Sequence, residues 1–212
     1  FPASAEPGKE FTSVTYSNVY FREPESRADQ TRMMSIVTTG SETGYYVDVF
    51  RSRKERGGDK MHDYFYHNLG QTMTLTAADG TDLNLQPTEE LAFAGAHLYG
   101  YSYLYDKKVA ATGKDVKATF TIDMKDKGGD DIVMNLWMKG EPDREVFTAL
   151  SPMTEGLSRT PGMPYNIKEQ PTLTFVARQH GEAWTRPFVA VYEPSTKKEP
   201  SAIQSVSYFD AE

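Results

Sequence analysis

Residues 45–67 read YYVDVFRSRKERGGDKMHDYFYH, and this stretch indicates the fold of the chain. Both of its ends are rich in aromatic and β-branched residues, which favour strands, and a charged connection containing Gly57 and Gly58 separates them. The stretch therefore predicts two strands joined by a loop. It also holds two of the four histidines of the chain, and it places Asp48 inside an otherwise apolar run.

The same alternation of apolar and polar residues recurs along most of the chain. Asp79-Gly80 and the segment 127–130 (KGGD) supply the turn residues that hairpins need. About a dozen short strands predict an all-β fold, a large and mainly antiparallel two-sheet β-sandwich. We expect one domain over residues 1–212, with loose ends at 1–11 and 209–212. The expected strands fall within residues 13–21, 32–39, 45–51, 61–67, 72–77, 82–86, 117–124, 132–138, 145–150, 172–178, 187–193 and 202–209.

Composition and charge exclude several functional classes. The absence of cysteine excludes thiolate zinc sites, iron–sulfur clusters and cysteine nucleophiles. A net charge of −7 argues against nucleic acid as a partner, although a local basic run around Arg51 leaves an acidic polysaccharide open. No apolar run approaches the roughly 20 residues that span a bilayer, so no membrane span is expected.

Asp48 is the most unusual residue in the strand YYVDVFR. It shares a strand face with Tyr46 and Phe50, so a charged group is expected among large apolar neighbours. A buried carboxylate needs a partner to remain ionised, and Arg32 on the preceding strand could provide one. Asp48 with Arg32 is therefore interpreted as a structural charge that fixes the strand register, with a functional acid as the alternative.

His62 and His67 lie five residues apart on one expected strand. An odd separation places their side chains on opposite faces, so they cannot converge on one metal ion. We expect hydrogen-bonded histidines and assign no metal ligand. With Arg51, both remain candidates for contact with a substrate or an interface.

Tyr99, Tyr101, Tyr103 and Tyr105 alternate in the segment HLYGYSYLY. On a strand they would line one face, and an exposed row could stack on sugar rings. The alternative is an inner face of the sandwich. Residues 87–101 also allow a short helix with Thr88 as its cap.

Four motifs in order, YYVDVFR, GGDKMHDYFYH, LSRTPGMPY and RPFVAVYEP, resemble the heparinase II/III-like polysaccharide lyases. The resemblance covers roughly residues 12–208. It implies the C-terminal β-sandwich portion of an enzyme whose catalytic residues lie mostly on a helical toroid, which acts on glycosaminoglycans or other acidic polysaccharides in the bacterial periplasm or outside the cell. The resemblance also implies a His-Asn-Thr-Val-like strand with a structural zinc site in the early sandwich. This sequence holds no such toroid and no such stretch before Tyr45, so no catalytic residue, cofactor or zinc ligand is carried over.

The sequence thus predicts a non-catalytic sandwich that supports a missing helical toroid, of the same protein or of a close partner, and lines part of the polysaccharide cleft. A parent protein is expected to be a polysaccharide lyase, and this chain alone is expected to be inactive. Two alternatives remain. The first is a carbohydrate-binding module that uses the tyrosine row, and the second is a protein-interaction or structural domain with an apolar surface patch.

Overall fold

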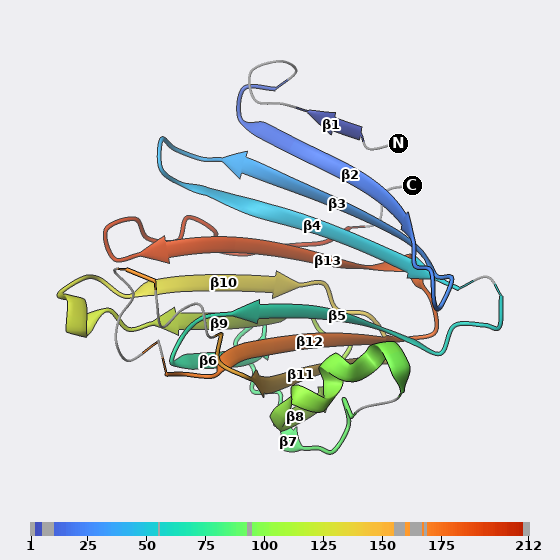
Figure 1. The fold of residues 1–212 in the computed structure, drawn as a ribbon. Helices are drawn as coiled ribbons and strands as arrows, with labels where there is room; N and C mark the ends of the chain where they lie inside the picture. The colour runs from blue at the N-terminus through green and yellow to red at the C-terminus, as the bar shows by residue number, and fades with distance from the viewer. Residues whose placement is uncertain are drawn as a thin grey trace.

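The computed structural model describes residues 3–5, 11–54, 56–92, 95–154, 160–161, 167 and 169–209. Nearly all regular structure in these residues is β, arranged as two antiparallel sheets of eight and five strands (Figure 1). The predicted all-β sandwich is therefore confirmed.

The larger sheet has the order β1-β2-β3-β4-β13-β10-β9-β6. Two turns predicted from sequence are present, with Gly128 at positive φ between β9 and β10 and Gly80 at positive φ in the turn that follows β6. The strands are β1 (Ala3–Ala5), β2 (Val14–Arg22), β3 (Asp29–Thr38), β4 (Gly44–Arg53), β6 (Thr72–Ala77), β9 (Val116–Ile122), β10 (Ile132–Met138) and β13 (Ala183–Thr196).

The smaller sheet has the order β5-β12-β11-β8-β7. Two short 3-10 helices complete the described structure: η1 (Ala96–Tyr103) precedes β8, and η2 (Lys125–Lys127) lies in the turn between β9 and β10. The strands of this sheet are β5 (Met61–Asn68), β7 (Gln86–Pro87), β8 (Tyr105–Ala111), β11 (Arg144–Ser151) and β12 (Thr172–His180).

The core lies between β13, β10, β9 and β6 of the larger sheet and β5, β12 and β11 of the smaller one. Its aromatic residues pack against one another, as where the rings of Tyr64 and Phe188 lie 5.6 Å apart. Other large side chains that are fully buried there are Phe120, Leu136, Met138 and Phe175. Removing these apolar surfaces from water supplies most of the driving force for the two sheets to associate.

The two sheets are offset, so the smaller sheet covers only part of the larger one. No strand of the smaller sheet lies in front of β2 and β3 in Figure 1. The buried core accordingly contains no residue of β2 or β3. These two strands form a wing whose inner face continues the core surface but lacks a covering layer among the described residues.

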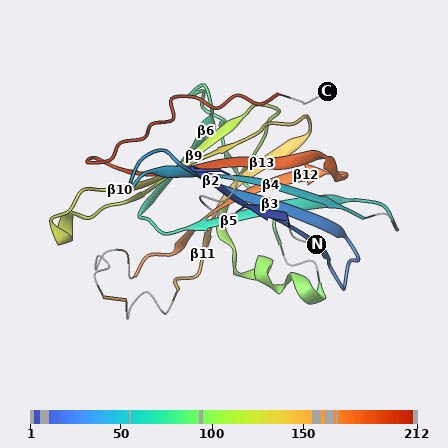
Figure 2. The same ribbon diagram turned by 90° about the horizontal axis from the view of Figure 1, so that it is seen from above.

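On the other side of the larger sheet, the C-terminal segment runs along its outer face, opposite to η1 (Figure 2). Residues 202–207 border a hollow with Val47 and Val191, and Ser207, Tyr208 and Phe209 border another with Val49 and Val189. The predicted strand at 202–209 is wrong, since none of these residues pairs in a sheet. Instead, Glu193 accepts hydrogen bonds from the backbone amides of Ala202 and Ile203 and holds the segment in place.

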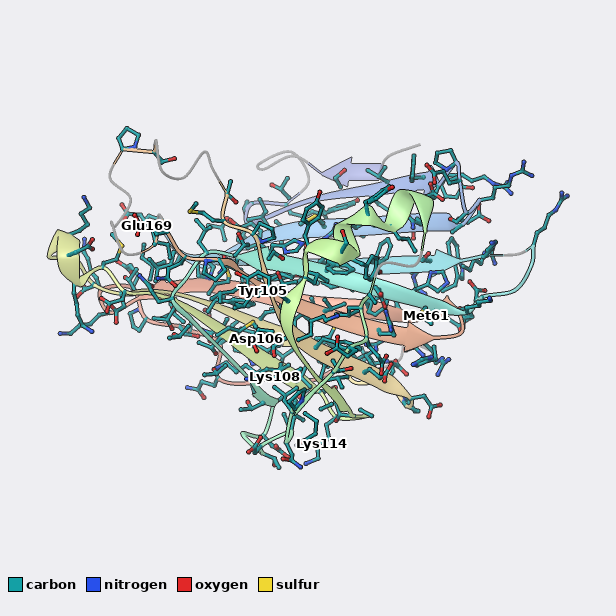
Figure 3. All side chains as sticks on the ribbon, turned by 60° about the horizontal axis from the view of Figure 1, so that its bottom comes forward. Met61, Tyr105, Asp106, Lys108, Lys114 and Glu169 are labelled. Carbon is teal, nitrogen blue, oxygen red and sulfur yellow. The ribbon has the colours of Figure 1, made fainter. Side chains whose placement is uncertain are left out.

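The expected tyrosine row is also wrong. Tyr99, Tyr101 and Tyr103 belong to the 3-10 helix η1, whereas Tyr105 opens β8, followed by Asp106 and Lys108 (Figure 3). A 3-10 helix has three residues per turn, so alternate residues point in different directions. A period of three was present in the sequence, because Leu98, Tyr101 and Leu104 recur at that spacing.

Candidate functional site

A buried charge cluster joins the wing to the core. Arg32 of β3 lies close to Asp48 of β4, and its Nε and Nη2 atoms donate to the carboxylate at 2.5 to 3.1 Å. From the opposite sheet, the hydroxyl of Tyr64 donates to Asp48 Oδ2 at 2.6 Å. Asp48 is fully buried, whereas the side chain of Arg32 is 49% exposed. The carboxylate therefore ties three strands together at the edge of the wing.

The tyrosines in this cluster act as hydrogen-bond donors. Since the proton of Tyr64 goes to Asp48, the contact between the two phenols makes Tyr192 the donor to Tyr64. Burial raises the pKa of both Tyr64 and Tyr192 far above the ordinary value of 10.0. The hydrogen bond to Asp48 in turn raises the pKa of Arg32, which stays charged. Both phenols consequently remain protonated at neutral pH.

The inner face of the wing is apolar and exposed. Val19 and Phe21 on β2 and Met34 and Ile36 on β3 are 43 to 52% exposed. The strand register places all four on the same face as Arg32 and Asp48. With Tyr46 of β4 they form a continuous surface, named here the open face, which contains a hollow of about 390 Å³ beside Phe50. Contiguous apolar patches of this kind mark interaction surfaces.

Neither His62 nor Arg51 lines the hollow of this surface. His62 Nε2 contacts Asp59 Oδ1 at 2.6 Å, and the same oxygen accepts from the backbone amide of Lys54. His62 thus closes the loop between β4 and β5. Arg51 donates to the backbone carbonyl of Trp184 on the outer side of the larger sheet. Neither residue lies in the hollows that the other predicted residues border.

His67, Tyr101 and Tyr103 come together on the outer face of the smaller sheet. With Phe65, Leu98 and Ser151 they line a cavity of about 500 Å³ between η1 and β5, named here the aromatic pocket. Tyr99 is 65% exposed on the same helix and does not border it. The predicted separation of the two histidines holds in the structure, because His67 makes its hydrogen bond to Thr174 on this outer face.

A second charge cluster fixes the helix to the sheet beside the aromatic pocket. Tyr101 donates to Asp63 Oδ2 at 2.5 Å, and Arg178 donates to both oxygens of Asp63 at 2.8 Å. Burial raises the pKa of Tyr101, so this phenol also stays a donor. The cluster repeats the Arg–Asp–Tyr arrangement found at Asp48.

Sequence reasoning missed the two tyrosines that complete the Asp48 cluster, and it missed the Asp63–Arg178 pair. The signal for Tyr64 was present, since an even spacing puts it on the face of His62 and Tyr66. The sequence carried no signal for the pairing of Asp63 with Arg178. This pairing depends on β5 and β12 becoming neighbours in the sheet, although more than 100 residues separate them in the chain.

Two further findings concern the described part of the chain. No helix there has the length and apolar character to cross a bilayer. Among the same residues, no three acidic or histidine side chains gather in a way that could hold a metal ion.

Comparison with known proteins identifies a relative. No family model matches the chain. An endo-acting ulvan lyase from Formosa agariphila is 34% identical over 196 residues, which is 91% of this chain and 22% of that protein. The chain spans about a fifth of the length of this curated relative and is related to a polysaccharide lyase.

Proposed function

We propose that this chain is a non-catalytic β-sandwich portion of a polysaccharide lyase. In this role it supports the catalytic part of the enzyme and borders the cleft for an acidic polysaccharide. The observation that carries the proposal is the open face, an apolar continuation of the core surface that no described residue covers. Since the chain matches only 22% of the related lyase, the rest of such an enzyme is the proposed occupant.

The chemistry of the open face suits a permanent partner within one protein. Interfaces of this kind resemble a core cut in half, with apolar residues at the centre. Arg32 stands among these residues, half-exposed, and is held by Asp48 through Nε and Nη2. No hydrogen bond from Arg32 Nη1 to a described residue is found, so this nitrogen can donate to a partner or to a carboxylate of the substrate.

The tyrosines support a non-catalytic role. A tyrosine that acts as a general base needs a pKa near the working pH. Burial moves the pKa of Tyr64 and Tyr192 in the opposite direction, and it raises the pKa of Tyr66 to about 12. These phenols are suited to holding the fold rather than to removing a proton from a sugar.

The finer assignment rests on the sequence motifs. YYVDVFR and RPFVAVYEP resemble the heparinase II/III-like lyases, so we propose a helical toroid as the catalytic part and an exported protein as the whole. The relative is named as an ulvan lyase, which makes ulvan the first substrate to test.

A chimera tests the proposed support role. This chain replaces the matching region of the Formosa agariphila lyase, and formation of unsaturated product from ulvan is followed by ultraviolet absorbance. We expect activity in the chimera and a loss of about tenfold or more when Val19 and Met34 are both changed to Lys, because charge on the open face opposes docking. Asn18→Lys on the opposite face of β2 is the matched control.

Two results would contradict the proposal. One is product formation by the 212-residue chain alone. The other is equal activity of the double lysine variant and the Asn18→Lys control, since the open face would then have no role in the assembled enzyme.

A further inference from the structure

We propose that the aromatic pocket binds one uncharged sugar ring of a polysaccharide chain. The pocket lies between η1 and the outer face of the smaller sheet, and it has no part in the open face. The choice of a polysaccharide rests on the proposed role within a lyase, whereas the preference for a sugar ring rests on the walls of the pocket.

The walls are fixed in the absence of a ligand. Tyr101 is held by Asp63, which Arg178 binds through two hydrogen bonds of 2.8 Å. The ring of Tyr101 meets Phe65 edge-on, with centroids 5.3 Å apart and planes at 87°. Because the helix is fastened to the sheet in this way, a ligand binds without the cost of ordering the wall.

The pocket presents apolar aromatic surface to an incoming group. Phe65 and Leu98 form apolar walls, and Tyr103 at the rim is 61% exposed. A sugar ring offers C–H groups on one face and hydroxyls at its edge, so an aromatic surface takes the face and polar atoms take the edge. A volume of about 500 Å³ lies within the range of ligand pockets.

His67 supplies the polar atom. Its Nδ1 is 2.9 Å from Thr174 Oγ1, which is 2.6 Å from Ser151 Oγ. Its ring stacks against Phe65 with centroids 5.9 Å apart. No hydrogen bond between Nε2 and a described residue is found, and the side chain is exposed. Nε2 is thus left to a ligand.

A hydroxyl is the natural partner of this nitrogen. Partial desolvation lowers the pKa of His67 below 6.5, so the imidazole is neutral at pH 7. Depending on the tautomer, a neutral ring either donates or accepts through Nε2, and a sugar hydroxyl can do the reverse in each case. With His67 neutral, none of the described residues that line the pocket carries a charged side chain at pH 7, which favours a ring without charge over a uronate.

Affinity electrophoresis of the whole chain tests the inference. Native gels contain ulvan, laminarin, dextran or xylan, and migration is compared with that in a gel without polysaccharide. We expect retardation by at least one polysaccharide, and about tenfold weaker retention for His67→Ala and for Tyr103→Ala. Tyr99→Ala is the control, because this exposed tyrosine is on the same helix but outside the pocket.

Two further measurements check the folding of each variant and the contribution of charge to retention. Thermal melts confirm that each variant folds, which is expected since His67 and Tyr103 are exposed. Retention through the pocket is expected to persist at about 1 M salt, because stacking is not screened. The proposal is overturned if no polysaccharide retards the chain, if salt abolishes retention, or if all three variants behave alike. The chimera measures lyase activity, whereas the gels measure retention by a polysaccharide. The proposed support role and the proposed sugar site can therefore fail independently.

Discussion

Removing Arg32 is the sharpest test of how the wing is attached to the core. In Arg32→Met, the fully buried carboxylate of Asp48 loses two donor atoms and keeps one hydrogen bond, from Tyr64. Breaking a buried pair from one side costs about 3–5 kcal/mol. Because the side chain of Arg32 is 49% exposed, water reaches the vacated position, and we expect a smaller loss of about 2–3 kcal/mol.

The measurement is urea unfolding followed by the fluorescence of Trp137 and Trp184. For a chain of this size, the expected loss of about 2–3 kcal/mol in the free energy of unfolding corresponds to a melting temperature that is lower by roughly 4–12 °C. Adding Asp48→Leu to Arg32→Met is expected to restore most of the stability, since no charge is then left unpaired. Arg22→Met, at an exposed position of β2, is the control and should change stability by less than about 0.5 kcal/mol. Equal stability of Arg32→Met and Arg22→Met would refute the reasoning.

Three further predictions concern stability. Tyr64→Phe removes the phenol bond to Asp48 and should cost about 1.5–3 kcal/mol in urea unfolding, whereas Tyr20→Phe on the wing should cost less. Because burial raises the pKa of Tyr64 and Tyr192, the unfolded chain releases their protons above pH 10 while the folded chain keeps them. The contribution of these phenols to the free energy of unfolding should therefore be fully present below pH 10 and be lost above it, by about 1.4 kcal/mol per pH unit for each tyrosine. The loss should be less steep in Tyr64→Phe. A free energy of unfolding that stays constant up to about pH 11 would contradict this. Gly70→Ala should cost about 1–3 kcal/mol in thermal melts, because φ is +152° and a Cβ would lie 2.7 Å from the carbonyl oxygen of Thr121; Gly129→Ala, with only an ordinary contact, is the comparison.

The fold class could be predicted because strand patterning is local. In β3, alternate residues point to opposite faces, and the same rule places His62 and His67 on opposite faces of β5 from their spacing alone. The prediction of a strand with a tyrosine row at residues 99–105 was wrong for a related reason. Two periods were present there, and the burial of Leu104 against the sheet selected the period of three over the period of two.

The site was harder to predict than the fold. The aromatic pocket combines residues from β5, η1 and β11, and the sequence carries no signal that brings Phe65, Tyr101 and Ser151 together. An apolar surface patch was one of the alternatives, but its position could not be predicted, since Val19, Phe21 and Met34 have the pattern of an ordinary core strand. Only the offset between the two sheets shows that nothing described in this chain covers them.

The two charge clusters share one strand. Asp63 and Tyr64 are consecutive residues of β5, and because they point to opposite faces, one holds η1 through Tyr101 while the other holds Asp48 at the wing. A slip of β5 along its axis would break both clusters at once. This strand therefore sets the position of the aromatic pocket and of the wing together, so any shift of the wing on assembly would be transmitted to the pocket through a single backbone segment.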